Sequence, residues 1–286
     1  MIFTTLISAA DLRSEFSDSR LVVVDCRFSL EDQEWGRNQY LESHIPGAVY
    51  AHLDEDLCSP VVPGVTGRHP MPSAEQLAAK LGKWGIDSSS KVVVYDAAGG
   101  AMAAARLWWL LGWLGHYAVA VVDGGWQAWL DSGGSAHSGL ETRSSSSFIP
   151  RVKRSRLLET EEILKRLTDP DFLLVDSRAE ERYRGEVEPI DPVAGHIPGA
   201  LLSPHENVLG ADGLFLPKQQ LRTHFEQLMG DINVKNTAFY CGSGVTAVQN
   251  ILAVAYAGLG DSRLYAGSWS EWITDPGRPI AMGEEG

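Results

Sequence analysis

Cysteine is scarce in this chain, and stretches long enough to cross a membrane are missing. The three cysteines, Cys26, Cys58 and Cys241, are an odd number without a C-x-x-C spacing in 286 residues, which argues against a disulfide framework and a zinc site. No apolar run approaches the roughly 20 residues that span a bilayer. The first six residues lack the basic and apolar regions of a signal peptide. We therefore expect a protein of a reducing compartment, by default the cytoplasm.

Basic residues are also in the minority. The chain has 24 Lys and Arg against 37 Asp and Glu, a formal net charge of -13, and no run of five or more basic residues. Nucleic acid and anionic membrane surfaces need basic patches, so we expect neither as a partner. Apolar content is ordinary: 44% hydrophobic and 21% charged residues are typical of a soluble globular protein, and the length suits two domains.

The chain repeats itself once. The motif His-Ile-Pro-Gly-Ala begins at His44 and again at His196, 152 positions later. Each copy follows an apolar run that ends in an aspartate, and Asp25 and Asp176 are 151 positions apart. Two later landmarks keep nearly the same spacing: Tyr95-Asp96 with Tyr240-Cys241, and Gly-Trp-x-x-Trp at 125–129 with Ser-Trp-x-x-Trp at 268–272. Four landmarks in the same order predict a duplication.

Each half has the pattern of an α/β domain built on a parallel sheet. Short apolar runs suit buried strands at 21–25, 91–95, 118–122, 172–176 and 236–240. Helical patterns alternate with them at 73–84, 100–114, 218–229 and 244–258. Gly- and Ser-rich segments follow the first half. We expect an N-terminal domain over 1–140, a linker over 141–157 and a C-terminal domain over 158–286.

The sharpest local signal surrounds Cys241, which ends an apolar strand and precedes a loop of small residues and a helical pattern from Ala247. Glycines at 242 and 244 let successive backbone N–H groups point at one centre, and the helix start adds its positive dipole end. Such surroundings stabilise an anionic sulfur and lower the pKa of the thiol. We predict a nucleophilic or persulfide-bearing Cys241; the alternative is a small buried residue at a strand end.

The equivalent loop of the first half begins with Asp96 in place of the cysteine, so only the second half can form a thiolate there. Cysteine phosphatases also cradle a thiolate, but they place an arginine six positions after it to grip phosphate. Here that position is Ala247, and the loop has no cationic side chain. Phosphate chemistry is therefore disfavoured. Cys26 and Cys58 lack a glycine cradle, and we interpret both as bystanders.

The two halves and the cysteine loop resemble the tandem-rhodanese family over almost the whole chain. The loop at 241–246, Cys-Gly-Ser-Gly-Val-Thr, is similar to that of the 3-mercaptopyruvate sulfurtransferases, whereas thiosulfate-preferring rhodaneses usually carry basic residues there. The resemblance implies two rhodanese domains, each a parallel sheet with helices on both faces, and a site at their interface. It also implies that Cys241 takes sulfur from mercaptopyruvate as a persulfide and passes it to a thiol such as reduced thioredoxin, or to cyanide, without a metal or organic cofactor.

The resemblance implies roles for further residues. Several mercaptopyruvate enzymes pair the loop serine with a histidine and an aspartate, and their motifs match Ser243, His69 and Asp54, a relay that would assist proton transfer. The alternative is a small loop residue and a turn histidine. The rest of the loop is assigned to substrate binding: Gly242, Gly244, Val245 and Thr246.

Arginine suits a carboxylate because its fork donates two hydrogen bonds. The family motif Arg-[Phe/Tyr]-x-Gly points to Arg182 as the residue that binds the substrate carboxylate; the alternative is a solvated, salt-bridged surface with neighbouring glutamates, to which we assign Arg184. A second arginine common in the family falls at Ile190 here. The protein could therefore bind mercaptopyruvate more weakly, or transfer sulfur from thiosulfate to cyanide instead. A third alternative is a non-catalytic rhodanese-like binding module, which the presence of Cys241 disfavours.

The remaining repeated residues are interpreted as architecture. Asp25 and Asp176 end strands, where carboxylates bond to backbone N–H groups. His44 and His196 occur in both the cysteine-bearing and the cysteine-free half, which favours a structural role for the pair.

Overall fold

The computed structural model describes residues 4–284 and divides into two compact units. The first combines the chain up to Ser59 with Pro72–Lys153 and Leu209–Phe215. The second combines Pro60–Met71, Arg154–Val208 and the chain from Leu216 onward. The first three residues, part of the segment read for a signal peptide, lie outside the described residues. The domain limits at 140 and 158 stay predictions.

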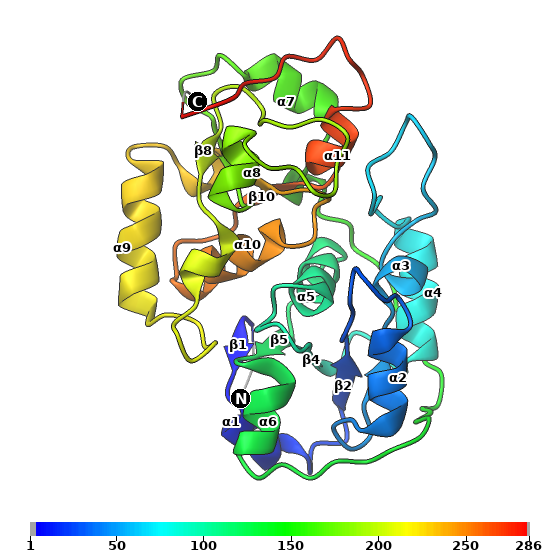
Figure 1. The fold of residues 1–286 in the computed structure, drawn as a ribbon. Coiled ribbons are helices and arrows are strands. Elements are labelled where there is room, and N and C mark those ends of the chain that lie inside the picture. The colour runs from blue at the N-terminus through cyan, green and yellow to red at the C-terminus, as the bar shows by residue number, and fades with distance from the viewer. Residues whose placement is uncertain (1–3, 285–286) are drawn as a thin grey trace. The chain divides into compact units, whose positions relative to one another are not determined.

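The first unit is a five-stranded parallel sheet in the order β1-β5-β4-β2-β3 (Figure 1). Its strands are β1 (Leu6–Ile7), β2 (Leu21–Asp25), β3 (Val49–Tyr50), β4 (Lys91–Tyr95) and β5 (Val119–Val122). Its helices are α1 (Ala9–Glu15), α2 (Trp35–Glu42), α3 (Leu53–Asp56), α4 (Ala74–Lys83), α5 (Ala103–Trp113) and α6 (Gly125–Asp131).

Helices cover both faces of this sheet. All five residues of β2 are buried, which a strand achieves only when both of its faces are packed. On one face, Val23 and Val93 share a core with Leu12 of α1 and Trp129 of α6. Helix α5 contributes nothing to that core, yet it packs on β4 and β5, so it covers the opposite face.

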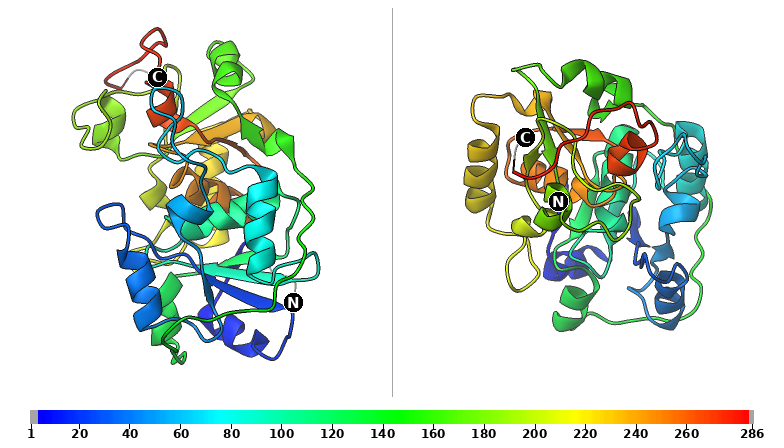
Figure 2. Two further views of the ribbon diagram at one scale, coloured as in Figure 1. Left: turned by 90° about the vertical axis from the view of Figure 1, so that its right-hand side faces the viewer. Right: turned by 45° about the horizontal axis from the view of Figure 1, so that its top comes forward.

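The second unit repeats the arrangement with the strand order β6-β10-β9-β7-β8. Figure 2 shows two further views of its ribbon, coloured mostly from green to red. Its strands are β6 (Leu157–Leu158), β7 (Leu173–Asp176), β8 (Leu201–Leu202), β9 (Thr237–Tyr240) and β10 (Arg263–Tyr265). Its helices are α7 (Thr160–Arg166), α8 (Glu180–Arg184), α9 (Lys218–Met229), α10 (Ala247–Tyr256) and α11 (Ser268–Trp272), with 3-10 turns at Arg154–Arg156, His205–Val208 and Val234–Asn236. The identical order confirms two tandem α/β domains of one fold.

Helices cover both faces of the sheet in the second unit, as they do in the first. Ile163 of α7 and Trp272 of α11 share one core with strand residues such as Leu174, while α10 packs on β9 and β10 from the other face. Because all strands are parallel, the loops after β7 and β9 leave the same edge of the sheet, and these loops carry Arg178 and Cys241.

Within the described part of the chain, no helix is long and apolar enough to cross a membrane.

Candidate active site in the second unit

Cys241 follows β9 directly, and its backbone is held by the start of α11. Its N–H donates to Ser268 Oγ at 3.1 Å, and its carbonyl accepts from the N–H of Trp269 at 3.0 Å. Ser268 adopts a φ of 54°, a left-handed conformation that a serine rarely takes. We infer that the bond to Cys241 offsets this backbone cost.

The loop after Cys241 requires glycine at one position. Gly244 has a φ of 74°, and a Cβ there would collide with the backbone of Ala266. Glycine therefore lets the loop turn tightly before α10 begins at Ala247. The turn directs backbone N–H groups toward the sulfur.

The pKa of the Cys241 thiol lies below its ordinary value, although the residue is only 2% exposed. Burial alone raises the pKa, but the Thr246 hydroxyl and the N–H groups of Ser243, Ala247 and Gly244 bond to the sulfur and more than reverse this. The other two thiols behave oppositely: burial raises the pKa of Cys58, and burial raises the pKa of Cys26 well above normal. Cys241 is thus the one of the three thiols suited to nucleophilic attack.

The Thr246→Val variant tests this account. Removing the hydroxyl removes a hydrogen bond that favours the thiolate, so we expect the pKa of Cys241 to rise and its alkylation at neutral pH to slow roughly tenfold. Because the thiolate is the reactive form, the rise of rate with pH should move to higher pH. The measurement is the rate of iodoacetamide labelling against pH, with Thr223→Val on the exposed face of α9 as the control. An unchanged profile would show that the backbone N–H groups alone set the pKa.

The matching loop of the first unit holds a carboxylate where Cys241 stands in the second. Asp96 Oδ1 accepts from the N–H groups of Ala98 and Gly100 at 2.9 and 2.8 Å, and Oδ2 accepts from Met102 and Ala104. Burial raises the pKa of Asp96, and these four N–H groups oppose that rise. The loop of this fold is therefore an anion cradle, filled by its own side chain in one unit and by a thiol in the other.

His69 lies against the cysteine loop. Its Nδ1 is 2.7 Å from Ser243 Oγ, and both residues are 6% exposed. The short segment Pro60–Met71 carries His69 into the second unit, where Gly67 sits so close to Gly267 and Ser270 that a Cβ would come within 2.7 Å of either. The structure thus brings together two of the three predicted relay residues.

Asp54, the third predicted relay residue, is in the first turn of α3 and belongs to the first unit. Its backbone N–H donates to His52 Nδ1 at 3.2 Å. A part for Asp54 in the relay stays a prediction.

Arg182 lies in an ion-pair network on α8 rather than on a solvated surface. Its Nη2 donates to Glu188 at 2.7 Å and to Asp191 at 3.1 Å, and its side chain is 16% exposed. Burial raises the pKa of Glu188, but the guanidinium of Arg182 reverses this and holds the pKa below its usual range. Arg184 has the surface role expected of it, because it pairs with Glu180 and Glu284.

Four residues of this site were not assigned to it from the sequence: Arg68, Asp191, Ser268 and Ser270. Arg68 pairs with Asp191, its N–H donates to Ser270 Oγ at 3.1 Å, and Ser268 supports the cysteine. Arg68 could have been found from its place beside His69, a predicted catalytic residue. Ser268 falls on the Ser-Trp-x-x-Trp landmark, but its left-handed backbone is visible only in the structure.

The repeated aspartates and histidines have matching structural contacts in the two units. Asp25 pairs with buried Arg27 at 2.6 Å, and Asp176 pairs with buried Arg178 at 2.7 Å. His44 Nδ1 is 2.7 Å from the carbonyl of Tyr40, as His196 Nδ1 is from that of Tyr183. These contacts hold the loops at the sheet edge in both units.

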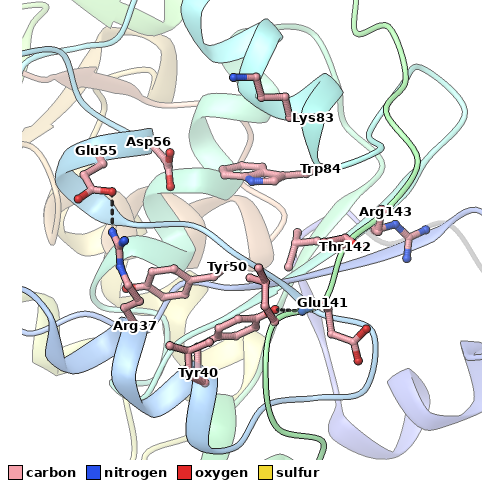
Figure 3. A pocket seen from close by; sticks show the side chains of 13 residues that line it. Arg37, Tyr40, Tyr50, Glu55, Asp56, Lys83, Trp84, Glu141, Thr142 and Arg143 are labelled. Atoms are coloured by element: carbon pink, nitrogen blue, oxygen red, sulfur yellow. Dashed lines mark hydrogen bonds and ion pairs between the residues drawn. The ribbon is translucent and has the colours of Figure 1, made fainter.

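Two features of the first unit, a cluster of possible metal ligands and a surface hollow, lack the chemistry of an active site. Glu34, His52 and Glu55 are close enough to share a metal, but His52 uses both ring nitrogens on backbone groups, and Glu55 pairs with Arg37 at 2.5 Å. A hollow of about 530 Å³ lies among α2, β3, α4 and residues 140–143. Figure 3 shows Arg37 paired with Glu55 there, and Tyr40 accepting from the N–H of Glu141. No cysteine lines this hollow.

Two α/β domains share one topology. The second holds an activated thiol in a glycine loop, and the first holds a carboxylate at the matching position, which defines a duplicated thiol enzyme. The model of the rhodanese-like domain matches residues 8–132 and 159–275, so the chain belongs to the rhodanese family. Its relatives are sulfurtransferases, and it is a sulfurtransferase of the tandem-domain kind.

Three relatives illustrate the similarity. The chain is 48% identical over 280 residues to a probable 3-mercaptopyruvate sulfurtransferase of Pseudomonas aeruginosa, covering 98% of each. It is 38% identical to a putative thiosulfate sulfurtransferase, SseB, of Mycobacterium tuberculosis, covering 97% of each. The solved structure of the 3-mercaptopyruvate sulfurtransferase from Leishmania major superposes with a TM-score of 0.83 at 30% identity, covering 94% of this chain and 74% of that one.

Proposed function

We propose that this chain is a 3-mercaptopyruvate sulfurtransferase that carries sulfur as a persulfide on Cys241. The observation that carries the proposal is the placement of Cys241 at the end of β9, in a tight glycine turn whose backbone N–H groups favour the thiolate and which has no cationic side chain of its own. A neutral loop suits a singly charged donor better than doubly charged thiosulfate. The name of the Pseudomonas aeruginosa relative supports the same donor.

In the first half-reaction, the Cys241 thiolate attacks the sulfur of 3-mercaptopyruvate. A sulfur–sulfur bond forms, the carbon–sulfur bond breaks, and its electron pair leaves on carbon as the enolate of pyruvate. Ser243 delivers a proton to that carbon and draws one from His69, with Asp54 as the carboxylate that orients the imidazole. The 2.7 Å contact of His69 with Ser243 supports this route.

In the second half-reaction, an acceptor takes the outer sulfur and restores the Cys241 thiolate. A thiol such as that of reduced thioredoxin, or cyanide, would serve. The loop N–H groups that stabilise the thiolate as leaving group also favour this step. No cofactor enters either half-reaction, and a reducing compartment such as the cytoplasm would keep the catalytic thiol available.

Thiosulfate:cyanide sulfurtransfer is the second candidate, and Ile190 favours it because the second arginine expected of a mercaptopyruvate enzyme is absent at that position. The two candidates differ in the donor, while the persulfide is common to both.

The deciding measurement is kcat/KM for 3-mercaptopyruvate and for thiosulfate, with one thiol acceptor. We expect a preference for mercaptopyruvate of about tenfold or more, equivalent to about 1.4 kcal/mol or more of transition-state binding. Cys241→Ser is the control that removes turnover of either donor. A preference for thiosulfate would replace the first candidate by the second.

A further inference from the structure

Two loops of the second unit expose apolar side chains to solvent. One lies in the segment Pro60–Met71, and the other follows α8. Five side chains of these loops are about half exposed: Val61 53%, Val62 50%, Val65 64%, Val187 52% and Ile190 48%. Apolar side chains that are exposed together mark contact surfaces, whereas single ones are common on any protein.

The two loops meet beside the catalytic cysteine. Arg68, at the end of the valine loop, forms an ion pair with Asp191, which directly follows Ile190. Arg68 Nη2 is 2.8 Å from the point where a Cβ would stand on Gly242, the neighbour of Cys241, and Figure 1 shows the valine segment beside α11. The five exposed side chains, here called the apolar rim, therefore stand on loops that adjoin the cysteine loop.

The valine loop is held in shape by its own hydrogen bonds. Thr66 Oγ1 accepts from the N–H of Val62 at 2.9 Å, and the Val62 carbonyl accepts from the N–H groups of Val65 and Thr66, both at 3.0 Å. Pro60 and Pro63 restrict the backbone further. Because the loop is already ordered, it loses little conformational entropy when a partner binds, and contact with its side chains favours association.

The charge and size of the apolar rim indicate the kind of partner. Residues 59–67 carry no charged side chain, in a chain whose formal net charge is -13. Five half-exposed side chains of this kind present roughly 400 Å², which is typical of a functional patch on a monomer but below the ~800 Å² that each partner buries in a stable complex. A second copy of this chain would also bring two strongly negative molecules together. A transient partner with an uncharged apolar contact surface fits the rim better than self-association does.

We propose that the apolar rim is the docking surface for a protein thiol that accepts sulfur from Cys241. The inference rests on the proposed function. Cys241 is 2% exposed, so a cysteine carried by another protein reaches the persulfide only when that protein lies against the loops around it. In the transfer, the acceptor thiolate bonds to the outer sulfur, the bond from that sulfur to Cys241 breaks, and its electron pair returns to Cys241 as the thiolate. The rim fits an acceptor whose reactive cysteine is surrounded by apolar surface, whereas small thiols and cyanide need no docking surface.

The test uses the full chain loaded with one sulfur on Cys241 and follows transfer to reduced thioredoxin and to dithiothreitol. Val61→Thr/Val65→Thr keeps the shape of both side chains and makes them polar. We expect the second-order rate constant with thioredoxin to fall about tenfold, because apolar contact is lost, and the rate constant with dithiothreitol to stay unchanged. Ile149→Thr/Val152→Thr is the matched control, since these side chains are 74% and 38% exposed and belong to the first unit.

The two acceptors separate docking from damage to the site. Equal falls with both would overturn the inference, because they would show that the valines support the cysteine loop. An unchanged rate with thioredoxin would overturn it as well, as would a wild-type chain that passes sulfur to dithiothreitol and not to thioredoxin. A wild-type dimer that the double variant loses in sedimentation would assign the rim to self-association instead. A wild-type chain that gains no sulfur from any donor would overturn the proposed function itself, and the mass of the chain shows this before an acceptor is added.

Discussion

Cys241→Ser is expected to abolish sulfur transfer, with a fall in kcat/KM of about 10⁴-fold or more for any donor. A serine hydroxyl in the same cradle stays protonated at neutral pH and cannot hold sulfane sulfur, so no route through the persulfide remains. The direct measurement is the intact mass after treatment with donor and removal of excess reagent. The wild-type chain should gain about 32 Da, the mass of one sulfur, and the variant should gain nothing.

The other two cysteines are the matched controls for that experiment. Burial raises the pKa of Cys26 and of Cys58, and neither follows a strand into a glycine loop. Cys26→Ser and Cys58→Ser should therefore keep both the mass gain and the turnover. A mass gain that survives in Cys241→Ser but is lost in either control would place the sulfur elsewhere and contradict the proposed mechanism. No gain in the wild-type chain with any donor would support a non-catalytic binding module.

The repeat and its long elements could be predicted because they depend on local patterns. The strand expected at 21–25 is β2 without change, and the helix expected at 218–229 is α9. Short apolar strands such as β3 (Val49–Tyr50) could not be predicted, because two residues carry no periodicity. They exist because the edge of a parallel sheet can pair with any extended segment that passes it.

The residues of the site also fall into those that local sequence patterns predict and those that they do not. Cys241 was predictable because strand, loop and helix follow one another along the chain. The groups that lower the pKa of its thiol, the Thr246 hydroxyl and the loop N–H groups, all lie within six residues of it. Arg68 was not, because its proximity to Arg182 depends on a short segment that leaves one compact unit for the other. Asp191 was not predictable either, since an acid between two arginines in space has no marker in sequence. Contacts over a long sequence separation are set by packing rather than by local pattern.

His69→Ala is expected to lower kcat/KM for 3-mercaptopyruvate by about 10²- to 10⁴-fold, the usual contribution of a positioned general acid. The effect should depend on the donor. Departure of pyruvate leaves an electron pair on carbon that needs a proton, whereas departure of sulfite from thiosulfate does not. The thiosulfate half-reaction should therefore change little. The measurement is single-turnover persulfide formation with each donor, with the exposed His137→Ala as control.

Ser243→Ala and the double variant complete the cycle. Because His69 Nδ1 and Ser243 Oγ are 2.7 Å apart and act on one proton, the double variant should lose about as much as either single variant. Asp54→Asn should lower the same rate if Asp54 orients the imidazole, and should leave it unchanged if His69 and Ser243 work as a pair. Equal losses of the persulfide-formation rate with both donors would mean that His69 only holds the loop in place. A contact that supports the cysteine loop affects every donor alike, whereas a proton donor affects only the donor whose carbon must be protonated.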